Sequence, residues 1–203
     1  MSNNDQQRLV LFDFDGTLTR HDSLFAFLRF FKGNMYFVYK LILALPGLVS
    51  YKLGLVDNST AKEKLLSKFL KGMTVDEFES RCRKFSQEIL PKLLNQRIFE
   101  KFQGHIVKGD RVVIISASIE DWILPWAKQW NVEVLATKLA ARSGRLTGKF
   151  DGSNCNGKEK VKRIKAHIKI TDYDEIWAYG DSSGDEPMLN LATQVVYRGK
   201  VRN

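Results

Sequence analysis

Four short apolar runs constrain the fold of this 203-residue chain more than any other feature of its sequence. They span residues 9–12, 112–115, 132–135 and 176–179, and amphipathic helical patterns lie between several of them. Short apolar runs that alternate with helical patterns are typical of buried parallel strands joined by helices. The sequence therefore predicts an α/β fold in which a parallel sheet carries helices on both faces.

A long helical stretch separates the first predicted strand from the second. The interval from about residue 22 to residue 91 is too long for one crossover helix, and it contains a capping box, Thr74-Val75-Asp76-Glu77. We expect residues 1–20 and 92–203 to form a Rossmann-like α/β core. Residues 21–91 are expected to form a mainly helical cap, which would overhang the end of the first strand, select substrates and exclude water.

Two aspartates directly follow the first predicted strand, in the segment Asp13-Phe14-Asp15-Gly16-Thr17. Two carboxylates at the end of a buried strand are costly, because they repel each other and lose their solvation. A cation or a reaction would account for the pair, and two acids in a solvated loop are the simpler alternative. Because carboxylates can accept phosphoryl groups in covalent catalysis, Asp13 and Asp15 are candidate catalytic residues.

Polar residues also follow two later strands of the predicted sheet. Ser116 comes after the second apolar run, Asp181 comes after the fourth, and Asp185 stands four residues further on. Since ligands bind beyond the carboxyl ends of parallel strands, we expect Asp13, Ser116 and Asp181 to share one site. The carboxylates offer the oxygen ligands that Mg²⁺ prefers. Ser116 and the N–H groups after it could hold an anion, or Ser116 could simply cap a helix.

A glycine-rich segment before residue 158 partly matches the phosphate-binding loop of nucleotide hydrolases. Gly152, Gly157 and Lys158 have the required spacing, but Glu159 stands where that loop has the Ser or Thr that binds magnesium. We therefore exclude an ATP-binding loop. Lys158 is predicted to lie at a helix start, where its ammonium group and the helix dipole can both face a phosphate. An ordinary surface lysine is the alternative.

Taken together and in this order, the four segments resemble the motifs of the haloacid dehalogenase (HAD) superfamily. The resemblance extends from Asp13 to Asp185, and the segment Asp-Phe-Asp-Gly-Thr-Leu-Thr is close to diagnostic. An aspartate at position 15 indicates the phosphatase branch, because the dehalogenases have a different residue there. The long insertion after the first motif is similar to that of the helical-cap branch near the phosphoserine phosphatases.

The resemblance implies a role for each matching position. Asp13 would be the nucleophile that forms an aspartyl-phosphate, and Asp15 would protonate the leaving alcohol and then activate water. Mg²⁺ would be held by the side chains of Asp13, Asp181 and Asp185 and by the backbone carbonyl of Asp15. The phosphoryl oxygens would be held by Ser116, Ala117 and Lys158.

The sequence departs from the phosphoserine phosphatases at the positions that would meet the substrate. Those enzymes have a glutamate shortly after the first motif, which contacts the amino group of the substrate, and this chain has Asp22. Asp22 is therefore a candidate substrate contact from the cap, or merely a cap for the helix that starts near Ser23. The Asn154-Cys155-x-Gly157 segment resembles a sister group, which includes bacterial enzymes that dephosphorylate phosphatidylglycerophosphate.

Residues 25–55 are unusually apolar and basic for a cap. Lys32, Lys40 and Lys52 punctuate this region, and no acid appears between Ser23 and Val56. Lys40, Pro46 and Gly47 interrupt the apolar run, so a membrane span of about 20 apolar residues is not expected. Two interpretations stay open: a buried pair of cap helices, or an apolar cationic surface that dips into an anionic bilayer.

The sequence as a whole predicts a Mg²⁺-dependent phosphomonoester hydrolase that acts on a small phosphorylated metabolite. A lipid-phosphate phosphatase at the membrane surface is the alternative, and it would also use the net charge of +9. A basic nucleic-acid-binding protein without turnover is a remote third, because no aromatic residues interleave Lys162, Lys165 and Lys169. The polar start of the chain and its two distant cysteines predict a cytoplasmic location, including peripheral contact with the inner face of the membrane.

Overall fold

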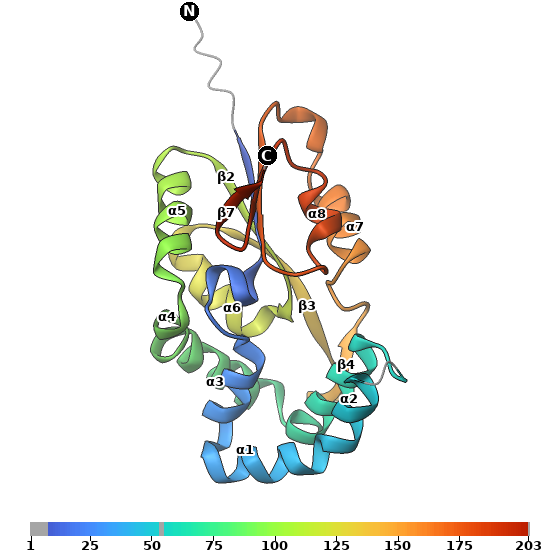
Figure 1. Cartoon of the computed structure of the whole chain (residues 1–203). Helices are drawn as coiled ribbons and strands as arrows, with labels where there is room; N and C mark the ends of the chain where they lie inside the picture. Colours follow the sequence, from blue (N-terminus) through green and yellow to red (C-terminus); the bar gives the residue numbers. More distant parts are fainter. Residues whose placement is uncertain (1–7, 53–54, 203) are drawn as a thin grey trace, which may run out of the picture.

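The computed structural model describes residues 8–52 and 55–202, apart from the side chains of residues 32 and 47–52. Its strands are β1 (Leu9–Phe12), β2 (Arg111–Ile119), β3 (Glu133–Arg142), β4 (Arg145–Asp151), β5 (Ile176–Gly180), β6 (Gln194–Tyr197) and β7 (Lys200–Arg202). They form one sheet in the order β4-β3-β2-β1-β5-β6-β7 (Figure 1). The five central strands run parallel, while β4 and β7 pair antiparallel at the two edges. The expected α/β class is confirmed, with a mixed rather than wholly parallel sheet.

Helices cover both faces of this sheet. Val10 and Phe12 of β1 belong to one apolar cluster, which includes residues of α5 (Gln96–Val107) and α6 (Glu120–Ala127). Leu9 and Leu11 belong to a second cluster, with residues of α7 (Lys158–His167) and α8 (Glu186–Leu189). Successive side chains of a strand point to opposite faces, so a strand covered on both faces must be apolar throughout. Two short helical turns precede strands of the sheet: η2 (Lys128–Trp130) lies between α6 and β3, and η3 (Ile170–Asp172) lies between α7 and β5.

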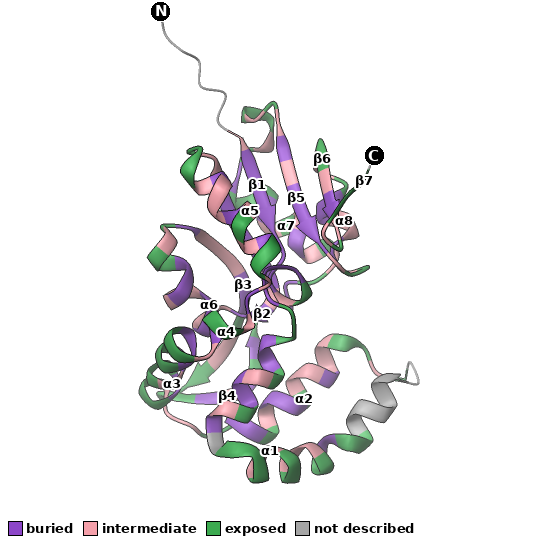
Figure 2. Cartoon of the chain, turned by 60° about the vertical axis from the view of Figure 1, so that its left-hand side comes forward, coloured by how far each residue is buried: buried purple, intermediate pink, exposed green. Residues whose placement is uncertain are grey.

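The cap helices lie beyond the carboxyl ends of the central strands (Figures 1 and 2). They are α1 (Ser23–Lys52), α2 (Asn58–Leu70), α3 (Val75–Glu88) and the short α4 (Leu90–Leu93). The Thr74 side chain accepts a hydrogen bond from the Glu77 N–H at the start of α3, as the capping box predicted. Gly33 has a φ of 80°, which favours glycine, and α1 turns near its middle into two arms (Figure 1).

A hairpin from the core supports the cap. The Gly72 N–H donates to the Leu146 carbonyl at 2.9 Å, and the Leu146 N–H donates to the Met73 carbonyl at 2.8 Å. Gly148 of β4 approaches α2 so closely that a Cβ atom there would lie 2.5 Å from the Cα atom of Ser67. The β3–β4 hairpin of the core thus contacts the cap. The division of the chain into a core (residues 1–20 and 92–203) and a cap (residues 21–91) stays a prediction.

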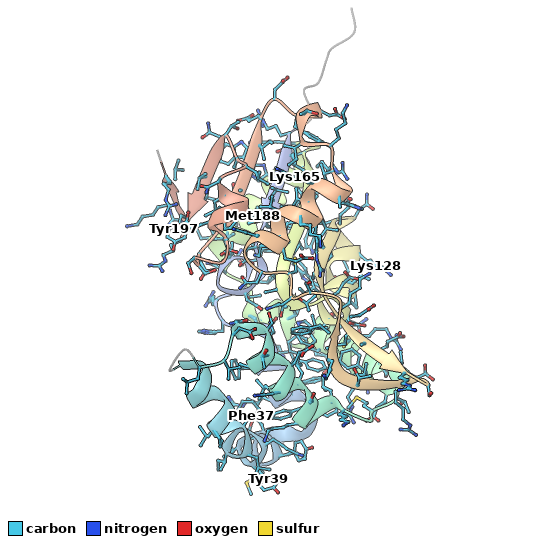
Figure 3. All side chains as sticks on the ribbon, turned by 90° about the vertical axis from the view of Figure 1, so that its right-hand side faces the viewer. Phe37, Tyr39, Lys128, Lys165, Met188 and Tyr197 are labelled. Carbon is cyan, nitrogen blue, oxygen red and sulfur yellow. The ribbon has the colours of Figure 1, made fainter. Side chains whose placement is uncertain are left out.

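The two arms of α1 differ in burial. The first arm buries Leu24, Phe27, Leu28 and Phe31 against the rest of the cap and the core. The second arm exposes a series of apolar side chains, namely Met35, Val38, Tyr39, Ile42, Leu43 and Leu45. Figure 3 shows Tyr39 at the outer edge of the cap. Within the described parts of the chain, none of the helices combines the length and apolarity needed to cross a membrane.

Candidate active site

The carboxyl ends of β1 and β5 bring three aspartates together. Asp13 follows β1, Asp181 and Asp185 follow β5, and one carboxylate oxygen of each lies within 4.8 Å of the others. Asp13 is 6% exposed and Asp185 is 1% exposed. The Asp13 N–H donates to the Tyr179 carbonyl at 2.9 Å, so the pairing of the two strands sets the position of the carboxylate. The sequence assigned these three acids to one site, and they lie side by side.

A buried lysine that the sequence interpretation missed joins the acids. The Nζ atom of Lys160 lies 2.6 Å from an oxygen of Asp13, 2.6 Å from an oxygen of Asp185 and 3.0 Å from the Ile115 carbonyl. Burial opposes a charge on this lysine, but the two carboxylates raise the pKa of Lys160 above its ordinary value. Burial raises the pKa of Asp13 to about 7, although Lys160 acts against that rise. A divalent cation beside Asp13 would lower the pKa again.

Lys158, the predicted phosphate contact, does not line the pocket, whereas Lys160 does. Lys158 is exposed in the first turn of α7, and it is not among the residues that line the pocket. Two positions along an α-helix differ by roughly 200° around its axis, because each turn takes 3.6 residues. When α7 begins at residue 158, Lys160 faces the sheet and Lys158 faces solvent. A residue's place at the start of a helix says nothing about which way its side chain faces.

Asp15 lies in the tight turn η1 (Phe14–Leu18) between β1 and the cap. One of its carboxylate oxygens accepts a hydrogen bond from the Ser23 N–H at 2.8 Å. Burial raises the pKa of Asp15 to about 6, and the charge of Asp22 adds to the rise. Gly16 follows with a φ of 81°, and a Cβ atom on it would lie 2.4 Å from an oxygen of Asp181. The glycine therefore lets the turn pass directly beside the acidic cluster.

Side chains from the core hold the start of α1, which in turn holds Asp15. The hydroxyls of Ser23 and Ser118 are 2.8 Å apart, and the indole N–H of Trp122 donates to the Ser23 hydroxyl at 3.1 Å. The helix that follows, α6, has Ile119 as its N-cap and no capping side chain, and the Ser118 hydroxyl contacts Ser23 of the cap. These contacts keep the Ser23 N–H aimed at the Asp15 carboxylate.

The last residues of β2 form the opposite wall of the pocket. Ser116 is buried, and its hydroxyl oxygen accepts a hydrogen bond from the Ser118 N–H at 2.9 Å. The Ala117 carbonyl accepts hydrogen bonds from the Thr137 hydroxyl at 2.9 Å and from the Lys62 Nζ at 2.8 Å. Lys62 comes from α2 of the cap and was not predicted, because its contact with the core has no local sequence signature. Burial lowers the pKa of Lys62 below its ordinary value.

These walls enclose a polar pocket of about 360 Å³ between the core and the cap. Asp13, Asp15, Asp181 and Asp185 line it, as do Ser116, Ala117, Lys160 and, from the cap, Asp22, Asn58 and Lys62. An oxygen of Asp22 accepts a hydrogen bond from the Leu24 N–H at 2.8 Å at the start of α1. Asp22 therefore caps the helix and still faces the pocket, so the two interpretations of this residue are compatible.

The donor set of the pocket suits a hard divalent cation. The three clustered carboxylates offer oxygen ligands and no sulfur or imidazole, which fits Mg²⁺ better than a soft metal. One Asp185 oxygen binds Lys160, and the other accepts hydrogen bonds from the Asp181 and Ser182 N–H groups and the Ser182 hydroxyl. Asp185 thus orients the residues around it. The Asp13 oxygen that does not contact Lys160 accepts a longer hydrogen bond, at 3.2 Å, from the Thr17 hydroxyl.

Comparisons with known proteins identify the family of the chain. The family model for haloacid dehalogenase-like hydrolases matches residues 10–190. Protein CicA of Caulobacter vibrioides is 37% identical over 194 residues, which are 94% of this chain and 85% of that protein.

Solved structures share the fold. A protein of unknown function from Bordetella pertussis Tohama I superposes with a TM-score of 0.80 at 24% identity, covering 95% of this chain and 90% of that one. A phospho-aspartyl intermediate analogue of a phosphoserine phosphatase gives a TM-score of 0.65 at 18% identity, with coverage of 95% and 87%.

Proposed function

Because the chain belongs to the haloacid dehalogenase-like hydrolases, we propose that it hydrolyses phosphomonoesters through an aspartyl-phosphate on Asp13, with Mg²⁺ as cofactor. One observation carries the proposal. The buried carboxylate of Asp13 lies between Lys160 and the acids of the metal-ligand set, and the pKa of the nearby Asp15 is raised to about 6. The phospho-aspartyl analogue of the related phosphoserine phosphatase supports the same chemistry.

In the first step, a carboxylate oxygen of Asp13 attacks phosphorus, and the bond from phosphorus to the leaving oxygen breaks. Protonated Asp15 donates its proton to that oxygen, so the product leaves as an alcohol. Lys160 stabilises the negative charge of the phosphoryl group. The Ser116 hydroxyl and the Ala117 N–H, near the carboxyl end of β2, bind the remaining phosphoryl oxygens.

In the second step, Asp15 takes a proton from a water molecule that attacks the aspartyl-phosphate. The bond from phosphorus to the Asp13 oxygen breaks, which releases phosphate and restores the carboxylate. A group that acts first as an acid and then as a base works best when its pKa is near the operating pH. Burial of Asp15 supports this dual role, since it brings the pKa to about 6.

Removal of the divalent metal should abolish turnover of p-nitrophenyl phosphate, and added Mg²⁺ should restore it. When bound by Asp13, Asp181 and the Asp15 carbonyl, Mg²⁺ supplies positive charge that offsets the repulsion between the anionic phosphate and the carboxylates. The measurement is the turnover rate in EDTA and again after excess MgCl₂ is added, with circular dichroism to verify that the fold persists. Full activity in EDTA would contradict the proposed cofactor.

The proposed substrate is a phosphorylated small molecule, with Asp22 facing a polar or cationic group of it. A membrane-surface role is the second candidate, and the exposed second arm of α1 favours it. Tyr39, Ile42 and Leu43 are each more than 40% exposed, and no acid occurs between residues 23 and 56. An apolar helix face with cations and no acids suits the surface of an anionic bilayer.

Vesicles test the membrane-surface candidate. The protein should sediment with vesicles that contain anionic phospholipid at low salt, and less with neutral vesicles, because both apolar insertion and charge contribute. Replacing Val38 and Ile42 by serine should reduce the bound fraction several-fold. A matched double substitution of exposed residues elsewhere, Lys162→Ser and Lys165→Ser, should change it less. If the protein stays in the supernatant with anionic vesicles at low salt, the peripheral role is excluded.

A further inference from the structure

An apolar cleft opens at the mouth of the catalytic pocket. It has a volume of about 550 Å³ and shares His21 and Asp22 with that pocket. Its other lining residues are largely apolar, and they are Phe25, Ala26, Arg29, Phe30, Asn34, Phe37, Ile89 and Leu93. A polar catalytic pocket that adjoins an apolar cleft is the arrangement expected for a ligand with a charged end and an apolar end.

The first arm of α1 builds one wall of this cleft. Asp22, Phe25, Ala26, Arg29 and Phe30 recur at intervals of three and four residues, so they share one side of the helix. The opposite side of the same arm, with Phe27, Leu28 and Phe31, is buried against the core and cap. Ala26 and Phe30 of the cleft wall are partly buried where they pack against the same apolar cluster. Phe25 is 38% exposed at the cleft.

The position of Asp15 directs the leaving group toward the cleft. As the proposed acid, Asp15 must face the leaving oxygen, and its carboxylate is held by the Ser23 N–H at the start of α1. The group attached to that oxygen therefore begins beside the first turn of α1, where the cleft opens at Asp22. Phe25 also lines a smaller cleft of about 290 Å³ toward α2. An apolar leaving group would thus contact Phe25 as soon as it leaves the catalytic pocket.

We propose that this cleft binds an apolar part of the leaving alcohol, so that the substrate is an amphiphilic phosphomonoester. The inference rests on the proposed phosphatase activity and adds the substrate class. The phosphate occupies the acidic pocket with Lys160, and an aliphatic or aromatic portion extends along α1 between Phe25 and Leu93. The occupant is the substrate itself, because the cleft adjoins, at His21 and Asp22, the pocket in which its phosphate reacts.

A series of alkyl phosphates tests the proposal. We expect kcat/KM to rise roughly twofold to fourfold per added methylene from ethyl to octyl phosphate, measured with monomeric substrate, because each methylene buries apolar surface. Phe25→Ser removes an exposed wall residue, and Ala26→Trp fills the cleft. Each substitution should bring the ratio of kcat/KM for octyl phosphate to kcat/KM for ethyl phosphate toward one. Met35→Ser is the matched control on α1, since Met35 is 88% exposed and lies outside the cleft, and it should keep the wild-type ratio.

The outcomes separate this inference from the proposed function. Turnover of ethyl phosphate without dependence on chain length would overturn the cleft as a binding site and leave the phosphatase proposal intact. A length dependence that both cleft variants retain would also overturn it. A dependence that appears only when the substrates are embedded in phosphatidylcholine vesicles would assign the effect to membrane recruitment and overturn it likewise. Absence of turnover with every phosphomonoester would refute the phosphatase proposal itself.

Discussion

Replacing Asp13 by asparagine should lower the kcat for p-nitrophenyl phosphate by at least about 10⁴-fold. Loss of a nucleophile in a covalent mechanism has effects of this order or larger. An amide of the same shape cannot attack phosphorus, while Lys160 keeps its second contact with Asp185 at 2.6 Å. The substitution therefore removes the reacting group and changes the volume of the site little. Steady-state turnover at saturating Mg²⁺ gives the comparison.

A trapping experiment shows whether the effect is chemical. Acid-quenched wild-type protein should carry phosphate from a labelled substrate, and hydroxylamine should release it, as it does from acyl phosphates. Asp13→Asn should carry none. Asp22→Asn is the matched control, because Asp22 lines the same pocket and asparagine can still cap α1. We expect its kcat to fall less than tenfold. Hydroxylamine-sensitive phosphate on the Asp13→Asn protein would assign the nucleophile to another residue.

The sequence predicted the residues whose positions follow from strands, and it failed where helix orientation and distant contacts decide. Asp13 and Asp181 come directly after apolar runs, and parallel pairing of β1 with β5 brings such positions to one edge. Lys160 was missed because its direction depends on the residue at which α7 begins. No spacing within the chain reports that the Lys62 side chain reaches the Ala117 carbonyl, which lies 55 positions away.

The same distinction applies to the cap. The capping box predicted the start of α3, because its hydrogen bond is local to four residues. For the apolar segment 25–55, the sequence left two interpretations open, a buried pair of cap helices or an exposed apolar surface. In the structure, α1 contains both a buried arm and an exposed arm. The turn near Gly33 separates them, and its positive φ becomes visible only in the folded chain. Likewise, β6 and β7 were not predicted, because strands of only four and three residues give a weak sequence signal.

Replacing Lys160 by methionine should lower kcat/KM by about 10²- to 10³-fold, whereas Lys158→Met should change it less than twofold. Loss of one preorganised charged donor at a reacting group has an effect of this size. Lys160 binds Asp13 directly, and Lys158 is exposed outside the pocket. The two lysines stand two residues apart on one helix, so this pair tests the corrected assignment directly. Equal losses in both variants, or a loss only in Lys158→Met, would contradict it.

The stability of the Lys160→Met protein shows whether Lys160 neutralises the buried carboxylates or only fills space in the core. Without the ammonium group, Asp13 and Asp185 remain buried beside each other, and breaking a buried ion pair costs about 3–5 kcal/mol. For a chain of this size, that cost corresponds to a fall in Tm of roughly 6–20 °C. Mg²⁺ should raise the Tm of the variant more than that of the wild type, because the cation replaces the missing positive charge among the carboxylates. If Mg²⁺ raises both Tm values equally, the lysine and the metal do not share the task of neutralising this cluster.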